Sequence, residues 1–187
     1  MDKHLRETRV GGMLAYDGHF LKVQRDDVSL PDGKLTQREY IRHPGAVVIL
    51  PLFDDGSVLL ERQFRYPLNR VFIEFPAGKI DPNEDALVCA KRELQEETGY
   101  LATDWQFVCT IHNAIAYSDE HLDIFLARGL VEGPQQLDDG EFLDVYRAPL
   151  AELLSGVREG KVTDVKTIIG AFWLEKIIAG EWAPAAQ

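Results

Sequence analysis

The chain has 187 residues, of which 45% are hydrophobic and 27% charged, a balance typical of a folded globular protein. Its formal net charge of −11 argues against broad binding to nucleic acid or anionic membranes, because no excess of cations is present to neutralise phosphates. The first residues lack the apolar core of a signal peptide, and no segment reaches the ~20 apolar residues of a membrane span, so we expect a cytoplasmic protein.

The first predicted segment, residues 1–43, is an antiparallel β extension. A Pro-Asp-Gly turn at residues 31–33 separates two runs rich in β-branched and aromatic residues, His19–Val28 and Leu35–His43. Short strands with few large apolar residues are marginal alone. We therefore expect this segment to pack on the rest of the chain, residues 44–187, or on a second copy.

The character of the chain changes at Pro44. Ala46–Leu50 is a continuous apolar run, which predicts a strand buried on both faces. A turn at residues 54–56 then leads into Ser57–Phe64, which we predict to pair with that strand as a hairpin. Further strands are predicted at Val71–Phe75, Phe107–Ile111, Leu122–Ala127 and Leu143–Arg147, with an acidic loop at residues 138–141.

Three helices are predicted among these strands. The first ends before Gly99, which stands where a left-handed residue terminates a helix. The second begins at Pro149, a favourable residue in a first turn. Because strands and helices mix without βαβ regularity, we expect an α/β fold with a mixed sheet between helices. The predicted helices are Asp85–Thr98, Pro149–Gly160 and Asp164–Ala179, and Ile168, Ile169, Phe172 and Trp173 of the third face inward.

An acidic cluster near the end of the first helix is the most informative feature. At ~100° per residue, Glu93 and Glu97 lie about 40° apart, and Glu96 lies about 60° to the other side. Each such pair of like charges destabilises a helix by about 0.2–0.5 kcal/mol, and the negative end of the helix dipole adds to the cost. Arg92 is the only nearby cation in the helix that would reduce this repulsion. A hard divalent cation would remove the penalty, and Mg²⁺ suits it because it binds few carboxylates and keeps waters and substrate phosphates.

The surroundings of the cluster follow a longer pattern. From Gly78 the chain reads Gly, five residues, Glu84, seven residues, then Arg-Glu-hydrophobic-x-Glu-Glu-x-Gly-hydrophobic, ending at Tyr100. This 23-residue segment resembles the Nudix box at every fixed polar and glycine position, which outweighs the alternative of a solvated acidic surface. The resemblance implies an α/β/α sandwich and an enzyme that hydrolyses a nucleoside diphosphate linked to another group.

The resemblance also implies roles for residues of the box. Glu93 and Glu97 would be the principal metal ligands, with Glu96 as a ligand of additional ions. The backbone carbonyl of Ala77 would complete the inner shell, and Arg92 would orient the glutamates. Mg²⁺, or Mn²⁺ in its place, would neutralise the phosphates and activate a bound water, while a carboxylate elsewhere takes the proton.

Outside the box, the chain is similar to the ADP-ribose pyrophosphatase group of Nudix hydrolases. The likeness rests on Arg42–Ala46 before the first core strand and on Gln63–Pro67 before the box. It implies that Glu141 is a general base or orients water, and that Glu120 lies near the metals. It further implies that Arg65 and Arg42 meet substrate phosphates or ribose.

Two features bear on the substrate and the assembly. The group often has a proline about 16 residues beyond the last glycine of the box, whereas residues 113–118 contain none. GDP-mannose, dinucleoside polyphosphates, coenzyme A and nucleoside triphosphates therefore remain alternative substrates to ADP-ribose. A non-catalytic ADP-ribose-binding module and a calcium-binding structural protein are weaker alternatives. Residues 1–43 resemble the extension that this group exchanges between subunits, which implies a homodimer.

Overall fold

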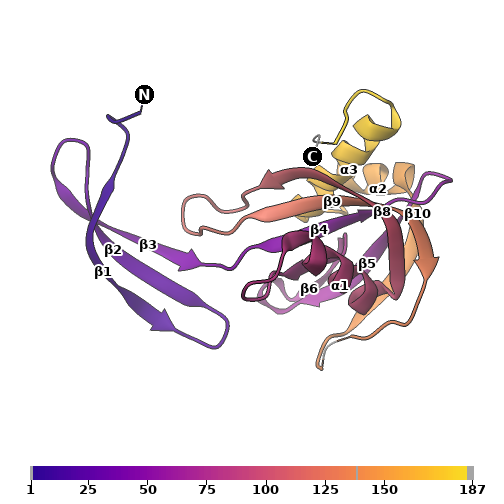
Figure 1. Cartoon of the computed structure of the whole chain (residues 1–187), viewed down its shortest axis with the longest axis horizontal. Coiled ribbons are helices and arrows are strands. Elements are labelled where there is room, and N and C mark those ends of the chain that lie inside the picture. The colour runs from indigo at the N-terminus through magenta and orange to yellow at the C-terminus, as the bar shows by residue number, and fades with distance from the viewer. Residues whose placement is uncertain (1, 138, 185–187) are drawn as a thin grey trace. The chain divides into compact units, whose positions relative to one another are not determined.

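The computed structural model describes residues 2–137 and 139–184, so Asp138 of the predicted acidic loop lies outside the described residues. The chain forms two compact units (Figure 1). The first contains the residues up to Pro44 together with His112–His121. The second contains Gly45–Ile111 and the chain from Leu122 onward.

The first unit is a three-stranded antiparallel sheet in the order β1-β2-β3, which agrees with the predicted extension. Its largest buried apolar side chain is Val28 of β2, so the unit has almost no core of its own. The segment 112–121 joins it through a bridge between Ile41 and Ser118 and through Asp119, whose side chain accepts a 2.7 Å hydrogen bond from the backbone N–H of His43. The strands are β1 (Thr8–Asp17), β2 (Lys22–Ser29) and β3 (Leu35–Arg42).

Two sheets make up the second unit. The four-stranded sheet has the order β7-β4-β9-β8; β4 and β9 are parallel and the other pairs antiparallel, so this sheet is mixed as predicted. The three-stranded sheet β10-β5-β6 is antiparallel throughout. The strands are β4 (Ala46–Pro51), β5 (Ser57–Arg65), β6 (Arg70–Glu74), β7 (Ala77–Lys79), β8 (Tyr100–Ile111), β9 (Leu122–Glu132) and β10 (Leu143–Pro149), and the short 3₁₀ helix η1 (Tyr66–Leu68) joins β5 to β6.

The predicted hairpin between β4 and β5 is wrong. Only one isolated bridge, between Leu52 and Val58, links the two segments. A strand has two edges, and those of β4 are already taken by β7 and β9, so β5 has no edge of β4 to pair with. The turn therefore carries the chain from one sheet to the other.

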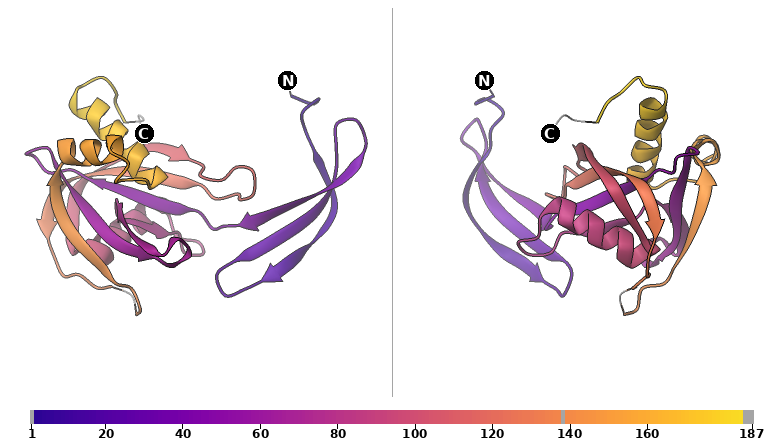
Figure 2. Two further views of the ribbon diagram at one scale, coloured as in Figure 1. Left: turned by 180° about the vertical axis from the view of Figure 1, so that it is seen from behind. Right: turned by 45° about the vertical axis from the view of Figure 1, so that its right-hand side comes forward.

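Helices cover both faces of the mixed sheet (Figures 1 and 2). On one face, Cys89 and Leu94 of α1 pack against Val47 and Ile49 of β4, while α2 and α3 pack on the other face. The α/β/α arrangement is therefore confirmed. Among the described residues, no helix has the length and apolar content needed to cross a membrane. The helices are α1 (Ala86–Thr98), capped by the side chain of Asp85 and ended by Gly99 at φ 72°, α2 (Leu150–Arg158), and α3 (Val165–Ile178), capped by Asp164.

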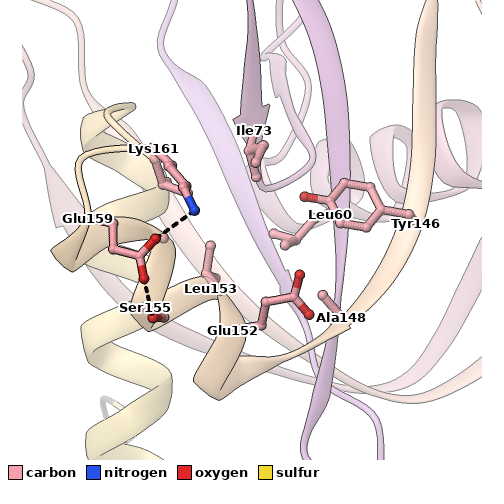
Figure 3. Close-up of a pocket in the computed structure, with 11 residues that line it drawn as sticks. Leu60, Ile73, Tyr146, Ala148, Glu152, Leu153, Ser155, Glu159 and Lys161 are labelled. Carbon is pink, nitrogen blue, oxygen red and sulfur yellow. Dashed lines mark hydrogen bonds and ion pairs between the residues drawn. The ribbon is translucent and has the colours of Figure 1, made fainter.

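A cavity of about 210 Å³ lies between β5, β6 and β10 on one side and α2 with its following loop on the other (Figure 3). Leu60, Tyr146 and Leu153 line its apolar part. At its rim Glu159 accepts a 3.0 Å hydrogen bond from the hydroxyl of Ser155 and pairs with Lys161 at 2.6 Å. No residue of the predicted Nudix box lines this cavity, so the chemistry of the box lies elsewhere.

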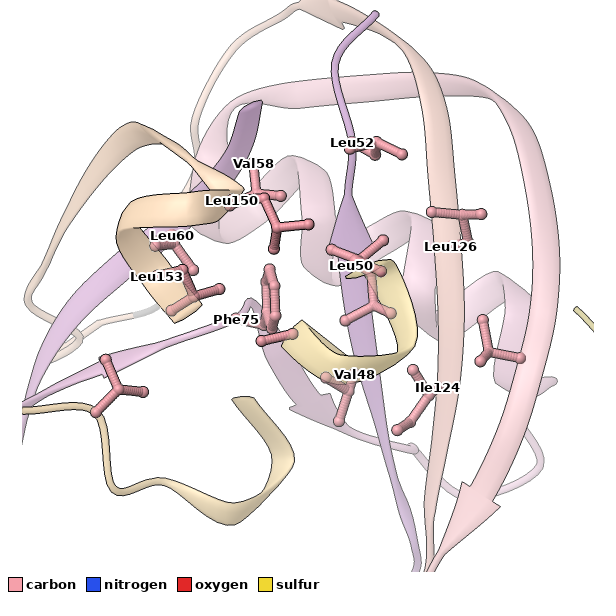
Figure 4. Close-up of a cluster of buried hydrophobic side chains, with 14 of the residues drawn as sticks. Val48, Leu50, Leu52, Val58, Leu60, Phe75, Ile124, Leu126, Leu150 and Leu153 are labelled. Carbon is pink, nitrogen blue, oxygen red and sulfur yellow. The ribbon is translucent and has the colours of Figure 1, made fainter. Parts of the chain in front are cut away.

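The main core fills the space between the two sheets and α2 and α3 (Figure 4). Helix α3 approaches so closely that a Cβ on Gly170 would lie 2.5 Å from Leu50 and 3.0 Å from Phe75. Small residues therefore occupy the middle of the buried face, which consists of Lys166, Thr167, Gly170, Ala171 and Leu174. Phe172 points away and is 45% exposed, which corrects the prediction that it faces the core.

Candidate active site

Arg92 ties together the carboxylates along α1. Its Nε and Nη2 donate hydrogen bonds to the two oxygens of Glu84, each at 2.9 Å, and its Nη1 donates to Glu93 at 2.8 Å and to Glu96 at 2.9 Å. Glu84 also accepts a 3.0 Å bond from the backbone N–H of Asp81, which fixes the loop before the helix. The bonds from Arg92 are the main cause that lowers the pKa of Glu84 to about 2. One guanidinium thus fixes three glutamates.

Glu97 points from the last turn of α1 to β7 and is only 5% exposed. Its Oε2 accepts a 3.0 Å hydrogen bond from the backbone N–H of Ala77, so the backbone of Ala77 lies beside this carboxylate. The side chain of Gln135 donates to the carbonyl of Glu97, and the N–H of Gln136 donates to that of Glu96. These bonds satisfy carbonyls that the end of a helix leaves free.

Gly78 leaves room for the carboxylate of Glu93. A Cβ on Gly78 would lie 1.8 Å from Cδ of Glu93 and 2.0 and 2.3 Å from its oxygens. The glycine is therefore required for this close approach. Glu93 is held against β7 from one side and by Arg92 from the other.

Burial changes the protonation of these acids. It raises the pKa of Glu93 to about 7, although Arg92 opposes the shift. For Glu97, burial and then the charges of Glu61, Glu93 and Glu141 raise the pKa well above the ordinary value. The folded protein therefore binds protons that a divalent cation could replace.

The loop before β10 brings Glu141 close to Glu93 and Glu97. Its Oε1 accepts a long hydrogen bond of 3.5 Å from Gln63 of β5. Its negative charge contributes to the raised pKa of Glu93 and of Glu97. The structure thus assembles Glu141 with Glu93 and Glu97, which are far from it in the sequence.

Glu61 of β5 is a fourth acid in this place, and it was not among the residues predicted from the sequence. It is 2% exposed, and its Oε1 is the one buried side-chain polar atom among the described residues that has no hydrogen-bond partner. Burial raises its pKa to about 8, and the charge of Glu141 adds to the shift. We call Glu61, Glu93, Glu97 and Glu141 the acidic centre. The sequence did contain a signal for it. Glu61 directly follows the apolar residues of β5 and lies on the same side of the strand as Gln63.

Arg65, a predicted substrate ligand, forms a bidentate pair with Glu74, with both N–O distances 2.7 Å. Glu74 also binds the ammonium of Lys166, which pairs in turn with Asp164 at 3.0 Å. The hydrogen bonds to Glu74 are the main cause that raises the pKa of Arg65, and the negative charge of Glu97 acts in the same direction. Arg65 is thus a fixed, half-exposed cation at the border of the acidic centre. Its link through Glu74 to Lys166 was not predicted from the sequence.

Arg42 and Glu120 lie in the first unit, whereas the other predicted site residues belong to the second. Arg42 is exposed and lines a shallow hollow with Lys22, His43 and Asp119. Glu120 places Oε1 3.7 Å from Nε2 of His43. These two residues therefore share one neighbourhood around His43.

The oxygens of the acidic centre suit a hard cation. Within the described ranges, no three His, Cys, Asp or Glu side chains are arranged as a preformed metal site. Mg²⁺ needs only one or two carboxylates, however, since waters and substrate phosphates complete its shell. The buried Glu97, Glu93 and the unpartnered Oε1 of Glu61 supply such oxygens. Glu96 lies outside the acidic centre, because its carboxylate pairs with Arg92 and is 30% exposed.

Comparisons with known proteins agree with this geometry. A family model described as NUDIX domain matches residues 42–168, more than half of the chain and including the whole box. The ADP-ribose pyrophosphatase of Bacillus subtilis (strain 168) is 35% identical over 175 residues, which cover 92% of this chain and 95% of that protein. The methanol dehydrogenase activator of Bacillus methanolicus is 34% identical over 177 residues, covering 94% and 96%.

A solved structure of an ADP compounds hydrolase matches with a TM-score of 0.85 over 95% of this chain and 97% of that chain. Its sequence identity of 24% means that this likeness concerns the fold. The fold, the filled box and the family model all lead to one assignment. The chain belongs to the Nudix family and is a Nudix hydrolase similar to the ADP-ribose pyrophosphatases.

Proposed function

We propose that the protein uses a divalent cation to hydrolyse the pyrophosphate bond of ADP-ribose or a related nucleoside diphosphate sugar. The products would be a nucleoside monophosphate and a sugar phosphate. The observation that carries the proposal is the acidic centre, whose buried carboxyl groups are unfavourable unless protons or a cation neutralise them. The substrate class is supported by the Bacillus subtilis relative, which is named an ADP-ribose pyrophosphatase.

The proposed ligands of the ion, Mg²⁺ or Mn²⁺ in its place, are Glu93, Glu97 and the carbonyl of Ala77, with Glu96 for an additional ion. A bound ion would neutralise the diphosphate and make a bound water easier to deprotonate. Arg92 keeps Glu93 and Glu96 at fixed positions through hydrogen bonds of 2.8 and 2.9 Å. The N–H of Ala77 fixes Glu97.

Glu141 is the proposed proton acceptor. Its hydrogen bond from Gln63 is long, at 3.5 Å, so the carboxylate can turn toward a water near Glu93 and Glu97. Glu120, in the first unit, is the second proposed acid. Arg65 and Arg42 are the proposed ligands of the substrate phosphates or ribose, and Arg65 is already oriented by Glu74.

A homodimer is also proposed, with the first unit as its interface. The unit lacks a core and exposes large apolar side chains that a second copy would cover. Sedimentation at micromolar concentration is expected to give the mass of two chains, and a monomer would contradict this part of the proposal. The exposed apolar side chains of the unit are Leu5, Val10, Met13, Leu14, Tyr16, Phe20, Leu21, Leu35, Ile115 and Tyr117.

The substrate is tested by a panel with Mg²⁺: ADP-ribose, GDP-mannose, a dinucleoside polyphosphate, coenzyme A and nucleoside triphosphates. ADP-ribose or another nucleoside diphosphate sugar is expected to give the highest kcat/KM. Preference for a member of another class would identify a Nudix hydrolase with a different substrate. Cleavage of none of them, with or without divalent ions, would refute the proposal.

The residues are tested by Glu→Gln substitutions, which keep the shape of the side chain. Glu97→Gln is expected to abolish turnover, because a buried oxygen ligand is lost. Glu141→Gln is expected to lower kcat by about 10²–10⁴-fold, the usual contribution of a general base, with little change in KM. Glu175→Gln, on the exposed face of α3, is the control for loss of one negative charge. A normal rate for Glu141→Gln would transfer the role to Glu120 or another group.

A further inference from the structure

Strand β5 separates two environments, because side chains alternate between its faces. Leu60 faces the main core and lines the cavity beside α2. Glu61 and Gln63 therefore face the opposite side, where Gln63 reaches Glu141. The carboxylate of Glu61 thus points to the side of the sheet where the acidic centre lies.

The side chains around Glu61 do not explain why a carboxylate is buried there. It stands opposite Glu74 in the register of β5 and β6, and Glu74 binds both Arg65 and Lys166. Oε1 of Glu61, by contrast, has no hydrogen-bond partner among the described residues, although the residue is only 2% exposed. A buried carboxylate oxygen without a partner is costly, and in native proteins it often marks the place of a ligand or ion.

We propose that Glu61 is an additional ligand of the divalent cation, which its Oε1 coordinates together with Glu97. This inference rests on the proposed metal-dependent function and adds a ligand from β5, outside the Nudix box. Glu61 stands opposite Glu74 in the register of β5 and β6, and Ala77, three residues after Glu74, donates a 3.0 Å hydrogen bond to Glu97, so both carboxylates lie at this end of β6. A cation between them would neutralise both and give Oε1 its missing partner.

The test measures Mn²⁺ binding by the electron paramagnetic resonance signal of the free ion, without substrate. The variants are Glu61→Gln, which keeps the shape, and Glu61→Met, which keeps the length but removes both oxygens. Each is expected to bind Mn²⁺ about 10- to 100-fold more weakly than the wild type, the range seen when groups that support a metal site are lost. Glu175→Gln, which removes one exposed negative charge, is expected to bind as the wild type.

Melting of the metal-free proteins separates a ligand from a structural residue. Both variants remove an unpartnered buried carboxylate, so their melting temperatures are expected to equal or exceed that of the wild type. Weakening of Mn²⁺ binding by less than about tenfold would overturn the inference, as would a lower melting temperature in both variants. A wild-type protein that binds no Mn²⁺ would refute the proposed metal-dependent function as well, whereas normal binding by both variants would refute only the role of Glu61.

Discussion

Raising the pH from about 5.5 to about 8 in the absence of divalent ions is expected to destabilise the protein. Burial raises the pKa of Glu93 from 4.5 to about 7 and that of Glu61 from 4.5 to about 8, and it raises the pKa of Glu97 well above 4.5. In the unfolded chain these groups lose their protons near pH 4.5. Over this interval the unfolded state therefore holds fewer protons than the folded state, and the free energy of unfolding falls as the pH rises.

Glu93 alone sets a lower limit for the effect. Of its shift from 4.5 to about 7, the part above about pH 5.5 corresponds to roughly 2 kcal/mol, which partial solvent screening reduces to about 1 kcal/mol. For a protein of this size that loss lowers the melting temperature by about 2–4 °C. Glu61 and Glu97 act in the same direction. Glu84, with its pKa lowered to about 2, contributes stability that is complete above about pH 4.5 and does not change in this interval.

The assay is thermal melting followed by circular dichroism, in EDTA, at several pH values between these limits. Glu93→Gln and Glu61→Gln are each expected to flatten the pH dependence, since neither amide titrates. Saturating Mg²⁺ is expected to raise the melting temperature most at the alkaline end, where the carboxylates are ready to bind it. A melting temperature that is constant or rises from about pH 5.5 to about 8 in EDTA would refute this account of the buried acids.

Three further substitutions test the packing. Gly78→Ala places a methyl group 1.8 Å from Cδ of Glu93 and is expected to lower kcat/KM at least about tenfold; unchanged turnover would show that Glu93 is not needed where it stands. Gly170→Ala is expected to lower the free energy of unfolding in urea by about 1–3 kcal/mol, because the added methyl meets Leu50 at 2.5 Å, and an unchanged midpoint would contradict the packing of α3. Arg92→Met removes the cation that three glutamates share and is expected to cost about 2–4 kcal/mol in EDTA, part of which Mg²⁺ restores; equal stability of both proteins in EDTA would be the opposing result.

Local signals account for what the sequence predicted well. The bounds of α1 follow from a capping aspartate, Asp85, and from Gly99, whose left-handed backbone ends the helix. Arg92 and its glutamates share one turn of that helix, so their proximity follows from helical periodicity alone. The mixed sheet and the helices on both of its faces were predicted from the order of strand and helix patterns along the chain and from the Nudix box.

What the sequence did not reveal depends on contacts between distant segments. The partners of β5 are β6 and β10, and the occupied edges of β4 that decide this are not visible in a local pattern. Phe172 looked like a core residue by type, but the close contact at Gly170 turns another face of α3 inward. Glu61 was not among the predicted site residues, because its burial is created by elements that lie far from it in the chain.

The alternation along β5 has a consequence for changes in chain length. A one-residue insertion or deletion inside this strand would exchange its two sides. It would turn Leu60 toward the carboxylates and drive Glu61 into the hydrocarbon interior beside Tyr146 and Leu153. Homologous chains can therefore vary in residue type along this strand, whereas length variation should be confined to the turns at its ends.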